Sequence, residues 1–164
     1  MSRSGYVDDG DECEKLNLWR GAVDRSIAGK RGQAFLREMA AALDAMPVKE
    51  LVTDLIVDAD KSVCAIGAVA LSRGLDVSDL DADDSSQVAA RFGISRALAC
   101  EIEYENDECG GSYRDGMYYQ ETPAERWTRM RKWVDEHLTA GIVAKLETPL
   151  PTANTGSTTT KEKP

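Results

Sequence analysis

Carboxylates are the residues of this sequence with the greatest capacity for chemistry, and they gather in its central part. Residues 76–108 contain ten Asp and Glu against only Arg91 and Arg96, a local balance of −8. Two carboxylates can act as general acid and general base when their surroundings separate their pKa values. No pair in this stretch is marked by its neighbours, so the sequence predicts no catalytic residue.

Alternating aspartates could instead bind a divalent cation. Asp79, Asp81 and Asp83 match alternate positions of the EF-hand calcium loop. In that loop, however, Asp84 would occupy the position that requires glycine, and Ala90 the position of the bidentate glutamate. We therefore expect no metal site here.

Cysteine and histidine, the other common metal ligands and nucleophilic partners, are few. Cysteines stand at positions 13, 64, 100 and 109 without a C-x-x-C pair, and His137 is the only histidine. A Ser-His or Cys-His pair would have to use His137, and nothing in the sequence marks its partner. We expect no cofactor and no enzymatic activity, and we interpret Cys64 as a small buried apolar residue.

One segment imitates a DNA-binding signature. In VAARFGISRALACEI, Ala89 is followed by Gly93 and Ser95 at the spacing of many helix-turn-helix units. The second helix of such a unit would contain Glu101, Glu103 and Glu105, which would repel the phosphates beside the groove. Direct nucleic-acid binding is therefore not expected, although a small regulator using residues 86–105 stays as an alternative function.

The central acids have two further interpretations. They could form a solvated face that complements the cationic helices at both ends of the domain, or a contact surface for a cationic partner. A contact surface of this kind could imitate nucleic acid, because carboxylates can occupy places meant for phosphates. Its candidate residues are Asp79, Asp81, Asp83, Asp84, Glu101, Glu103, Glu105, Asp107 and Glu108.

A tyrosine-rich run follows the acids. CGGSYRDGMYYQ contains Tyr113, Tyr118 and Tyr119 around an Asp115-Gly116 pair, a composition that suits a tight hairpin or a mobile loop. Tyr and Met are enriched where proteins meet, so these tyrosines are candidate contact residues. Alternatively, the rings cover the apolar edge of the last helix.

The elements that must position these residues are mainly helical. Apolar residues recur at helical spacing over 15–28 and again over 33–46, which favours a helical hairpin. LVTDLIV and SVCAI predict a small antiparallel β element near 51–66, and GAVALSRG predicts a short helix that ends at Gly74. Two more short helices are expected, one capped by Ser85 or Ser86 and the other by Ser95.

The last helix has the strongest signals. Thr122, Pro123 and Glu125 predict an N-cap, a first helical position and a Thr-x-x-Glu capping box. Its expected apolar face consists of Trp127, Met130, Val134 and Leu138. Its cationic residues, Arg126, Arg129 and Lys132, are expected to lie mainly away from that face.

Length and composition place these elements in one domain. The 164 residues are 42% apolar and 30% charged, with a net charge of −9, as in ordinary folded domains. The longest apolar run, Val63–Leu71, is far shorter than the roughly 20 residues that span a bilayer. We predict a compact bundle of five or six short helices over 13–146, a flexible acidic N-terminus over 1–12 and a disordered Thr-rich tail over 147–164.

Several stretches resemble a group of small uncharacterised proteins encoded by bacteriophages and prophages. They include SGYVDD, WRGAV, GKRGQAFLREM with ALDAMP, VCAIGAVALSRG, EYENDE and ETPAERWTRMRKWV, which together cover most of the chain from Ser4 to Val134. The resemblance implies an origin and no particular chemistry. It suggests a phage protein that acts in the cytoplasm of a bacterial host, in agreement with an opening segment that lacks a signal-peptide core.

From these observations, we expect a non-enzymatic accessory protein that binds a host or phage macromolecule through its acidic surface. The expected partner is a protein, which in the mimicry interpretation is basic or nucleic-acid-handling, and no membrane contact is expected. The alternatives are the helix-turn-helix-like regulator and a structural or assembly component of the phage. The sequence leaves the oligomeric state open.

Overall fold

The computed structural model of this chain describes residues 13–58 and 60–146. These residues form six helices and one antiparallel hairpin, so the predicted mainly helical fold is confirmed. The elements are α1 (Cys13–Ala28), α2 (Lys30–Ala45), α3 (Ala65–Arg73), α4 (Ser85–Phe92), α5 (Arg96–Asp107), β1 (Ser112–Arg114), β2 (Met117–Tyr119) and α6 (Pro123–Leu146). The flexible N-terminus predicted for 1–12 and the tail predicted for 147–164 lie outside the described residues.

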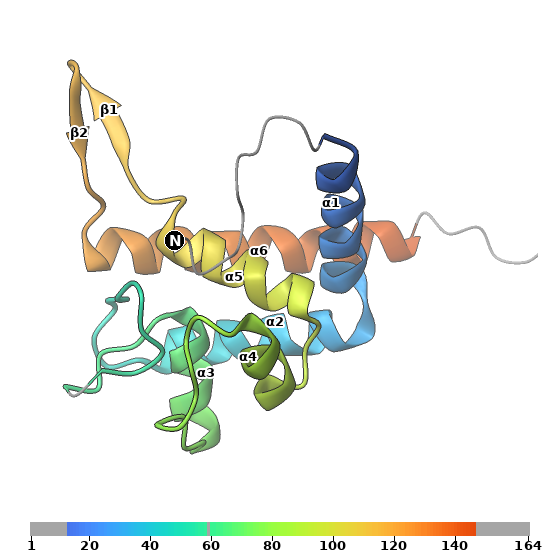
Figure 1. The fold of residues 1–164 in the computed structure, drawn as a ribbon, viewed down its shortest axis with the longest axis horizontal. Coiled ribbons are helices and arrows are strands. Elements are labelled where there is room, and N and C mark those ends of the chain that lie inside the picture. The colour runs from blue at the N-terminus through green and yellow to red at the C-terminus, as the bar shows by residue number, and fades with distance from the viewer. Residues whose placement is uncertain (1–12, 59, 147–164) are drawn as a thin grey trace, which may run out of the picture.

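The helices pack around one hydrophobic core. The long helix α6 runs along the molecule and lies against α1, α2 and α5, while α5 also contacts α1, α3 and α4 (Figure 1). The side chains at the centre of this core are at most 1% exposed, and each contributes about 1.5–3 kcal/mol through burial. They include Leu36, Met39, Leu43, Ile66, Val69, Leu98, Ile102, Met130 and Val134.

Several helix ends follow their local sequence signals. Ser95 caps α5 by accepting a hydrogen bond from the Leu98 N–H, and Gly74 ends α3. The capping box of α6 is also present. The Thr122 N–H donates to the Glu125 carboxylate over 2.9 Å, and the Glu125 N–H donates to Thr122 Oγ1 over 3.3 Å.

Two other helix ends differ from the prediction by a few residues. Asp84 caps α4 in place of Ser85 or Ser86, because its carboxylate accepts from two backbone N–H groups of the first turn. Only Gly29 separates α1 from α2, so α2 begins at Lys30, before the predicted start after Gly32.

The β element predicted near 51–66 is wrong in extent. This segment makes only one isolated antiparallel bridge, between Val57 and Val63, and the described hairpin lies in the tyrosine-rich run. Asp54 and Lys61 have positive φ angles of 64° and 62°, which interrupt an extended strand. The β-branched residues that suggested strands instead lie in a loop that is anchored by buried Leu51 and Ile56.

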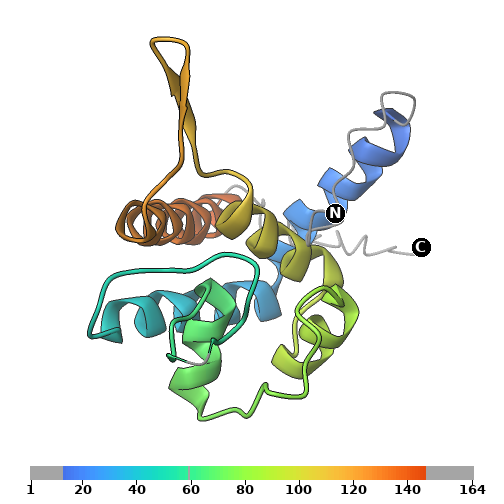
Figure 2. The ribbon, with the colours of Figure 1, turned by 60° about the vertical axis from the view of Figure 1, so that its left-hand side comes forward.

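The hairpin projects from the helical body. In two views it leaves the molecule just before α6 begins and extends away from the helices (Figures 1 and 2). We call residues 112–119, which comprise β1, β2 and their turn, the arm.

Candidate functional site

Two of the predicted acidic contact residues are buried. Glu101 is 5% exposed and Glu103 is 2% exposed, because the α5 surface that contains them packs against neighbouring helices. Glu101 forms an ion pair with Arg20 of α1 over 3.0 Å. The predicted contact face therefore does not include these two residues, and part of the central acidity pairs with the cationic N-terminal helix inside the fold.

The aspartates before α4 are on the surface and organise their own loop. Asp79 forms a two-pronged ion pair with Arg91, and this pair lowers the pKa of the Asp79 carboxyl. Asp81 accepts a hydrogen bond from the Asp83 N–H, while Asp84 caps α4. Asp81 and Asp83 remain exposed, so this loop keeps part of the predicted acidic surface.

Burial also argues against a recognition helix in α5. All seven residues from Ala97 to Glu103 are buried in the fold. A recognition helix needs an exposed face to enter the major groove of DNA. In the described structure, this part of α5 fills the core instead, so the helix pair α4–α5 is a packing unit.

The described thiols are poorly suited to nucleophilic or metal chemistry. Cys64 does more than fill space, because its sulfur caps α3 by accepting from the Gly67 N–H over 3.4 Å. Burial raises the pKa of Cys100, and burial beside Glu105 raises the pKa of Cys109 to about 11. Within residues 13–58 and 60–146, no three His, Cys, Asp or Glu residues are grouped so that they could hold a metal ion.

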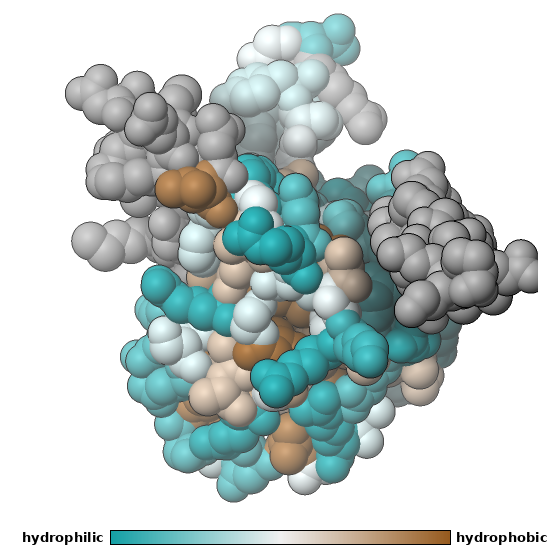
Figure 3. All heavy atoms as spheres, turned by 90° about the vertical axis from the view of Figure 1, so that its right-hand side faces the viewer, coloured by the Kyte–Doolittle hydropathy of each residue, from teal (hydrophilic) through white to brown (hydrophobic). Residues whose placement is uncertain are grey.

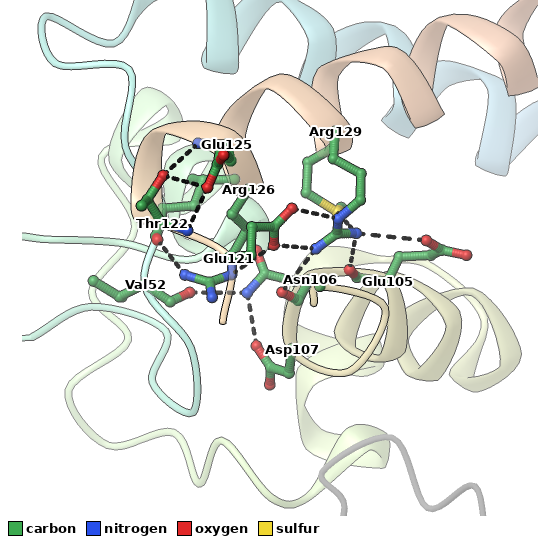
Figure 4. Close-up of polar contacts among 12 residues, drawn as sticks. Val52, Glu105, Asn106, Asp107, Glu121, Thr122, Glu125, Arg126 and Arg129 are labelled. Carbon is green, nitrogen blue, oxygen red and sulfur yellow. Dashed lines mark hydrogen bonds and ion pairs between the residues drawn. The ribbon is translucent and has the colours of Figure 1, made fainter. Parts of the chain in front are cut away.

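A cluster of charged residues joins α5 to the start of α6 (Figure 4). Arg129 binds both carboxylate oxygens of Glu121, over 2.7 and 2.8 Å, and also donates to the backbone carbonyl of Glu105 at the end of α5. The Glu121 side chain is only 9% exposed. We call Glu105, Asn106, Glu121, Arg126 and Arg129 the base cluster, because it lies below the arm.

Arg126 and Asn106 extend the base cluster toward the 51–64 loop. Arg126 is 5% exposed and donates to the Leu51 carbonyl over 2.8 Å. Asn106 donates to the Val52 carbonyl and accepts from the Ala65 N–H at the start of α3. The expectation that Arg126 and Arg129 lie away from the packed face of the last helix is thus wrong, because Arg126 donates to the Leu51 carbonyl and lies 3.6 Å from Glu121, while Arg129 binds Glu121 and a backbone carbonyl of α5.

The remaining acids of α5 also belong to this region. Glu105 lies 3.7 Å from Arg129, but burial dominates and raises the pKa of its carboxyl. Asp107 accepts a hydrogen bond from the Asn106 side chain, and Glu108 is exposed just before the arm. These positions support the base of the arm and do not continue the surface formed by Asp81 and Asp83.

A cleft of about 450 Å³ lies between the base cluster and the arm. Arg129, Glu121 and Glu125 line it together with Tyr119 and Gln120. The charged groups in its wall are already hydrogen-bonded to one another or to backbone, as described above. The cleft therefore lacks the convergent, available polar groups that usually orient a small ligand.

The arm is a hairpin closed by a two-residue turn. Asp115 and Gly116 have φ angles of 51° and 78°, which are typical of the type I′ turn that the Asp-Gly pair predicted. Tyr113 faces Tyr118 across the strands with 5.3 Å between ring centroids. Tyr118 also donates to the Gly110 carbonyl over 3.2 Å, which ties the second strand to the base of the first.

Apolar side chains project from both faces of the arm. Because directly opposed residues share a face, Tyr113 and Tyr118 lie on one face, and Met117 and Tyr119 lie on the other. Their exposed fractions are 78%, 57%, 61% and 46%, respectively. The alternative that these rings cover the last helix is therefore wrong, and the hairpin alternative of the sequence is confirmed over the mobile loop.

The arm concentrates apolar exposure that is scattered elsewhere. Among the residues whose exposure the structure describes, the other large exposed apolar side chains belong to different helices and loops; they are Leu18, Val48, Leu55 and Leu71. On the side opposite the arm, hydrophobic residues lie in separate small groups among hydrophilic ones, where grey atoms do not cover the surface (Figure 3). Single exposed apolar residues are normal, whereas a group of four indicates a contact surface.

Comparisons with protein-family models, curated proteins and solved structures gave no match to this chain. Within the described residues, no helix combines the length and the apolar character needed to cross a bilayer. The features of the described residues that bear on function are the arm, the base cluster and the acidic loop, which contains Asp79, Asp81, Asp83 and Asp84 before α4.

Proposed function

We propose that this chain is a non-enzymatic accessory protein that binds a protein partner, and that the arm is its main contact element. The observation that supports this proposal is the exposure of Tyr113, Met117, Tyr118 and Tyr119 on the two faces of a projecting hairpin. Tyr and Met are enriched at protein interfaces, and truncation of buried tyrosines there often weakens binding strongly.

The shape of the arm favours binding as well as its composition. The Asp-Gly turn, the ring contact between Tyr113 and Tyr118, and the hydrogen bond from Tyr118 to Gly110 order the hairpin before any partner arrives. Binding a preorganised element avoids much of the entropy cost of ordering side chains at an interface. More of the free energy gained by burying the small apolar area of the arm is therefore available for binding.

Charge favours a protein over a nucleic acid as this partner. A two-stranded ribbon can enter the major groove of DNA, but such binding depends on cations that neutralise phosphates. Residues 109–120 contain one Arg and one Asp, and the acids Glu108, Glu121 and Glu125 flank the arm in the sequence. The arm is therefore neutral and offers no excess of cations that could neutralise phosphates.

The acidic loop is a second and smaller candidate surface. Asp81 and Asp83 are exposed, but Asp79 is neutralised by Arg91. A cationic partner could use the loop to supplement contacts made by the arm. The phage or prophage origin that the resemblance implies would place such partners in a bacterial cell.

The experiment compares proteins captured from a bacterial host lysate by three tagged full-length chains. They are the wild type, a Tyr113→Ser/Met117→Ser arm variant and a Leu71→Ser control, in which an exposed apolar residue of α3 is removed instead. We expect specific partners on the wild type and the control, and at least a roughly tenfold loss on the arm variant. Equal capture by all three chains would contradict the proposal, provided that circular dichroism shows the arm variant folded.

A further inference from the structure

At the two edges of the arm, some backbone N–H and C=O groups make no hydrogen bond within the hairpin. In a hairpin closed by a two-residue turn, the residues that flank the turn form a hydrogen-bonded pair, here Arg114 and Met117. The next pair, Tyr113 and Tyr118, is then a non-hydrogen-bonded pair. The backbone N–H and C=O groups of both tyrosines point outward, one pair of groups at each edge of the ribbon.

Such a ribbon is a template for another strand. Isolated two-stranded hairpins are marginally stable in water, and an exposed edge can pair with a strand of a second chain. β2 is short, which limits edge pairing, but its residues Met117, Tyr118 and Tyr119 include no charge or proline that would block it. The β1 edge, Ser112–Arg114, includes a charged residue and only one ring.

The sequence of β2 is self-complementary about Tyr118. If two β2 strands pair antiparallel with Tyr118 opposite Tyr118, each Met117 lies opposite Tyr119 of the second copy. Methionine sulfur and aromatic rings attract one another, and cross-strand pairs of this kind stabilise sheets. On the other face, Tyr113 and Tyr118 of both copies form a row of four rings across a four-stranded sheet.

We infer that a second copy of this chain binds the β2 edge of the arm, so that the protein forms a twofold-symmetric dimer through a four-stranded sheet. Self-pairing is isologous, so one edge supplies both halves of the interface. The inference rests on the proposed function, because it uses the same arm as a contact element. In the dimer, the surface offered to a partner is the four-stranded sheet formed by the two arms.

The area and charge of the arm fit such a dimer. The three rings and Met117 expose roughly 500 Å² on each arm, and edge pairing covers only the part of this surface that faces the second copy, so the dimer buries less than about 1,000 Å² in total, as in weak and transient interfaces. The whole chain has a charge of −9, but residues 109–120 are neutral. Pairing at projecting arms therefore keeps the two acidic bodies apart, and an interface of this size is typical of weak, reversible association.

Sedimentation equilibrium of the pure full-length protein tests this inference. We expect the wild type to dimerise reversibly, with a dissociation constant below about 200 µM. Tyr118→Pro removes the outward N–H of the β2 edge and should weaken dimerisation at least tenfold. The control is Tyr113→Pro, which makes the same change at the β1 edge and removes the same ring contact, although not the hydrogen bond from Tyr118 to Gly110, and it should change the affinity less than about threefold.

Each result decides the inference. A wild type that is monomeric at every concentration overturns it, and equal weakening by the two proline variants overturns the assignment to the β2 edge. Backbone amide spectra identify a proline variant whose hairpin has unfolded, in which case Tyr118→Lys against Tyr113→Lys repeats the comparison by placing charge at the two edges. The pure protein is measured without a partner, so a monomeric wild type would overturn the dimer and not the proposed function. A wild type that dimerises but captures no partner from the lysate would support the dimer and contradict the proposed function.

Discussion

The base cluster and the arm are neighbours in the chain, but the first contains buried, paired charges and the second contains exposed apolar side chains. In the base cluster, Glu121 and Arg129 are ions whose hydrogen bonds are made within the fold. Two residues before Glu121, Tyr119 ends an arm whose apolar side chains extend into solvent. Charge is thus turned inward and apolar surface outward, the reverse of the usual distribution.

This difference shows which residues stabilise the fold and which are available for contacts. The buried acids and arginines hold α5, α6 and the 51–64 loop together, so they are occupied before any partner arrives. The rings and Met117 of the arm, by contrast, are not buried in the isolated chain, so the favourable free energy of burying them is gained only when a partner binds. The location of charge in the sequence is therefore a poor guide to the contact surface of this protein.

Among variants of the base cluster and the arm, the largest expected effect tests whether the base cluster stabilises the body of the protein. Arg129→Ala leaves the 9% exposed Glu121 side chain without its two-pronged partner, and it should lower the free energy of unfolding by about 3 kcal/mol. Arg131→Ala is a matched control on the same helix, because its partners Asp44 and Asp135 are more than half exposed and water can solvate them. It should cost less than about 1 kcal/mol.

Urea unfolding of the three proteins at pH 7 measures this comparison. Equal losses for Arg129→Ala and Arg131→Ala would mean that the base cluster is no more important than a surface ion pair. The base cluster would then not be distinguished from the exposed arm by a larger contribution to the stability of the fold.

A smaller effect concerns Glu105, the member of the base cluster whose pKa is shifted toward the neutral form. The pKa of Glu105 is raised by burial, so its ionisation costs stability as pH rises from about 4.5 through its folded pKa. Glu105→Gln should therefore raise the free energy of unfolding at pH 7 by about 0.5 kcal/mol, and this gain should vanish below about pH 4.5.

Glu38 provides the opposite case on the surface. Its hydrogen bonds with Arg73 lower the pKa of Glu38, so the stability that its charge contributes is present above about pH 4.5 and disappears as pH falls through the lowered value. Glu38→Gln should lower the free energy of unfolding at pH 7 by about 0.5 kcal/mol. Urea unfolding at pH 7 and pH 3 separates the cases, and a loss for both variants at pH 7 would show that the ionised Glu105 stabilises the fold after all.

Much of the fold was predictable because its signals are local. The Thr122–Glu125 capping box, the end of α3 at Gly74 and the Asp115-Gly116 turn depend on neighbouring residues, and each is present. The base cluster was not predictable in this way. Arg126 lies four positions before Met130 and so shares its side of the helix, but its charge suggested an outward position.

The contacts that hold Arg126 inward come from distant parts of the chain. Its guanidinium donates to a carbonyl 75 residues earlier, a tertiary interaction that no helical periodicity can reveal. The same reason explains the 51–66 segment, where β-branched residues favoured strands but Leu51 and Ile56 are buried against the helices. The tyrosine-rich arm was identified as a candidate contact, and only the structure could distinguish exposure from packing against α6.

The smallest expected effect tests the arm side of the comparison. Tyr113→Ser should change the global free energy of unfolding by less than about 0.5 kcal/mol, because Tyr113 is 78% exposed and the hairpin can open without unfolding the core. Hydrogen exchange should nevertheless accelerate in the arm, where the variant loses the ring contact with Tyr118. A core control, Phe92→Ala, should cost about 3–5 kcal/mol, since Phe92 is 3% exposed and packs edge-on against Phe35. A loss above about 1 kcal/mol for Tyr113→Ser would mean that the arm stabilises its own body, and the contact role would then have to move to another surface.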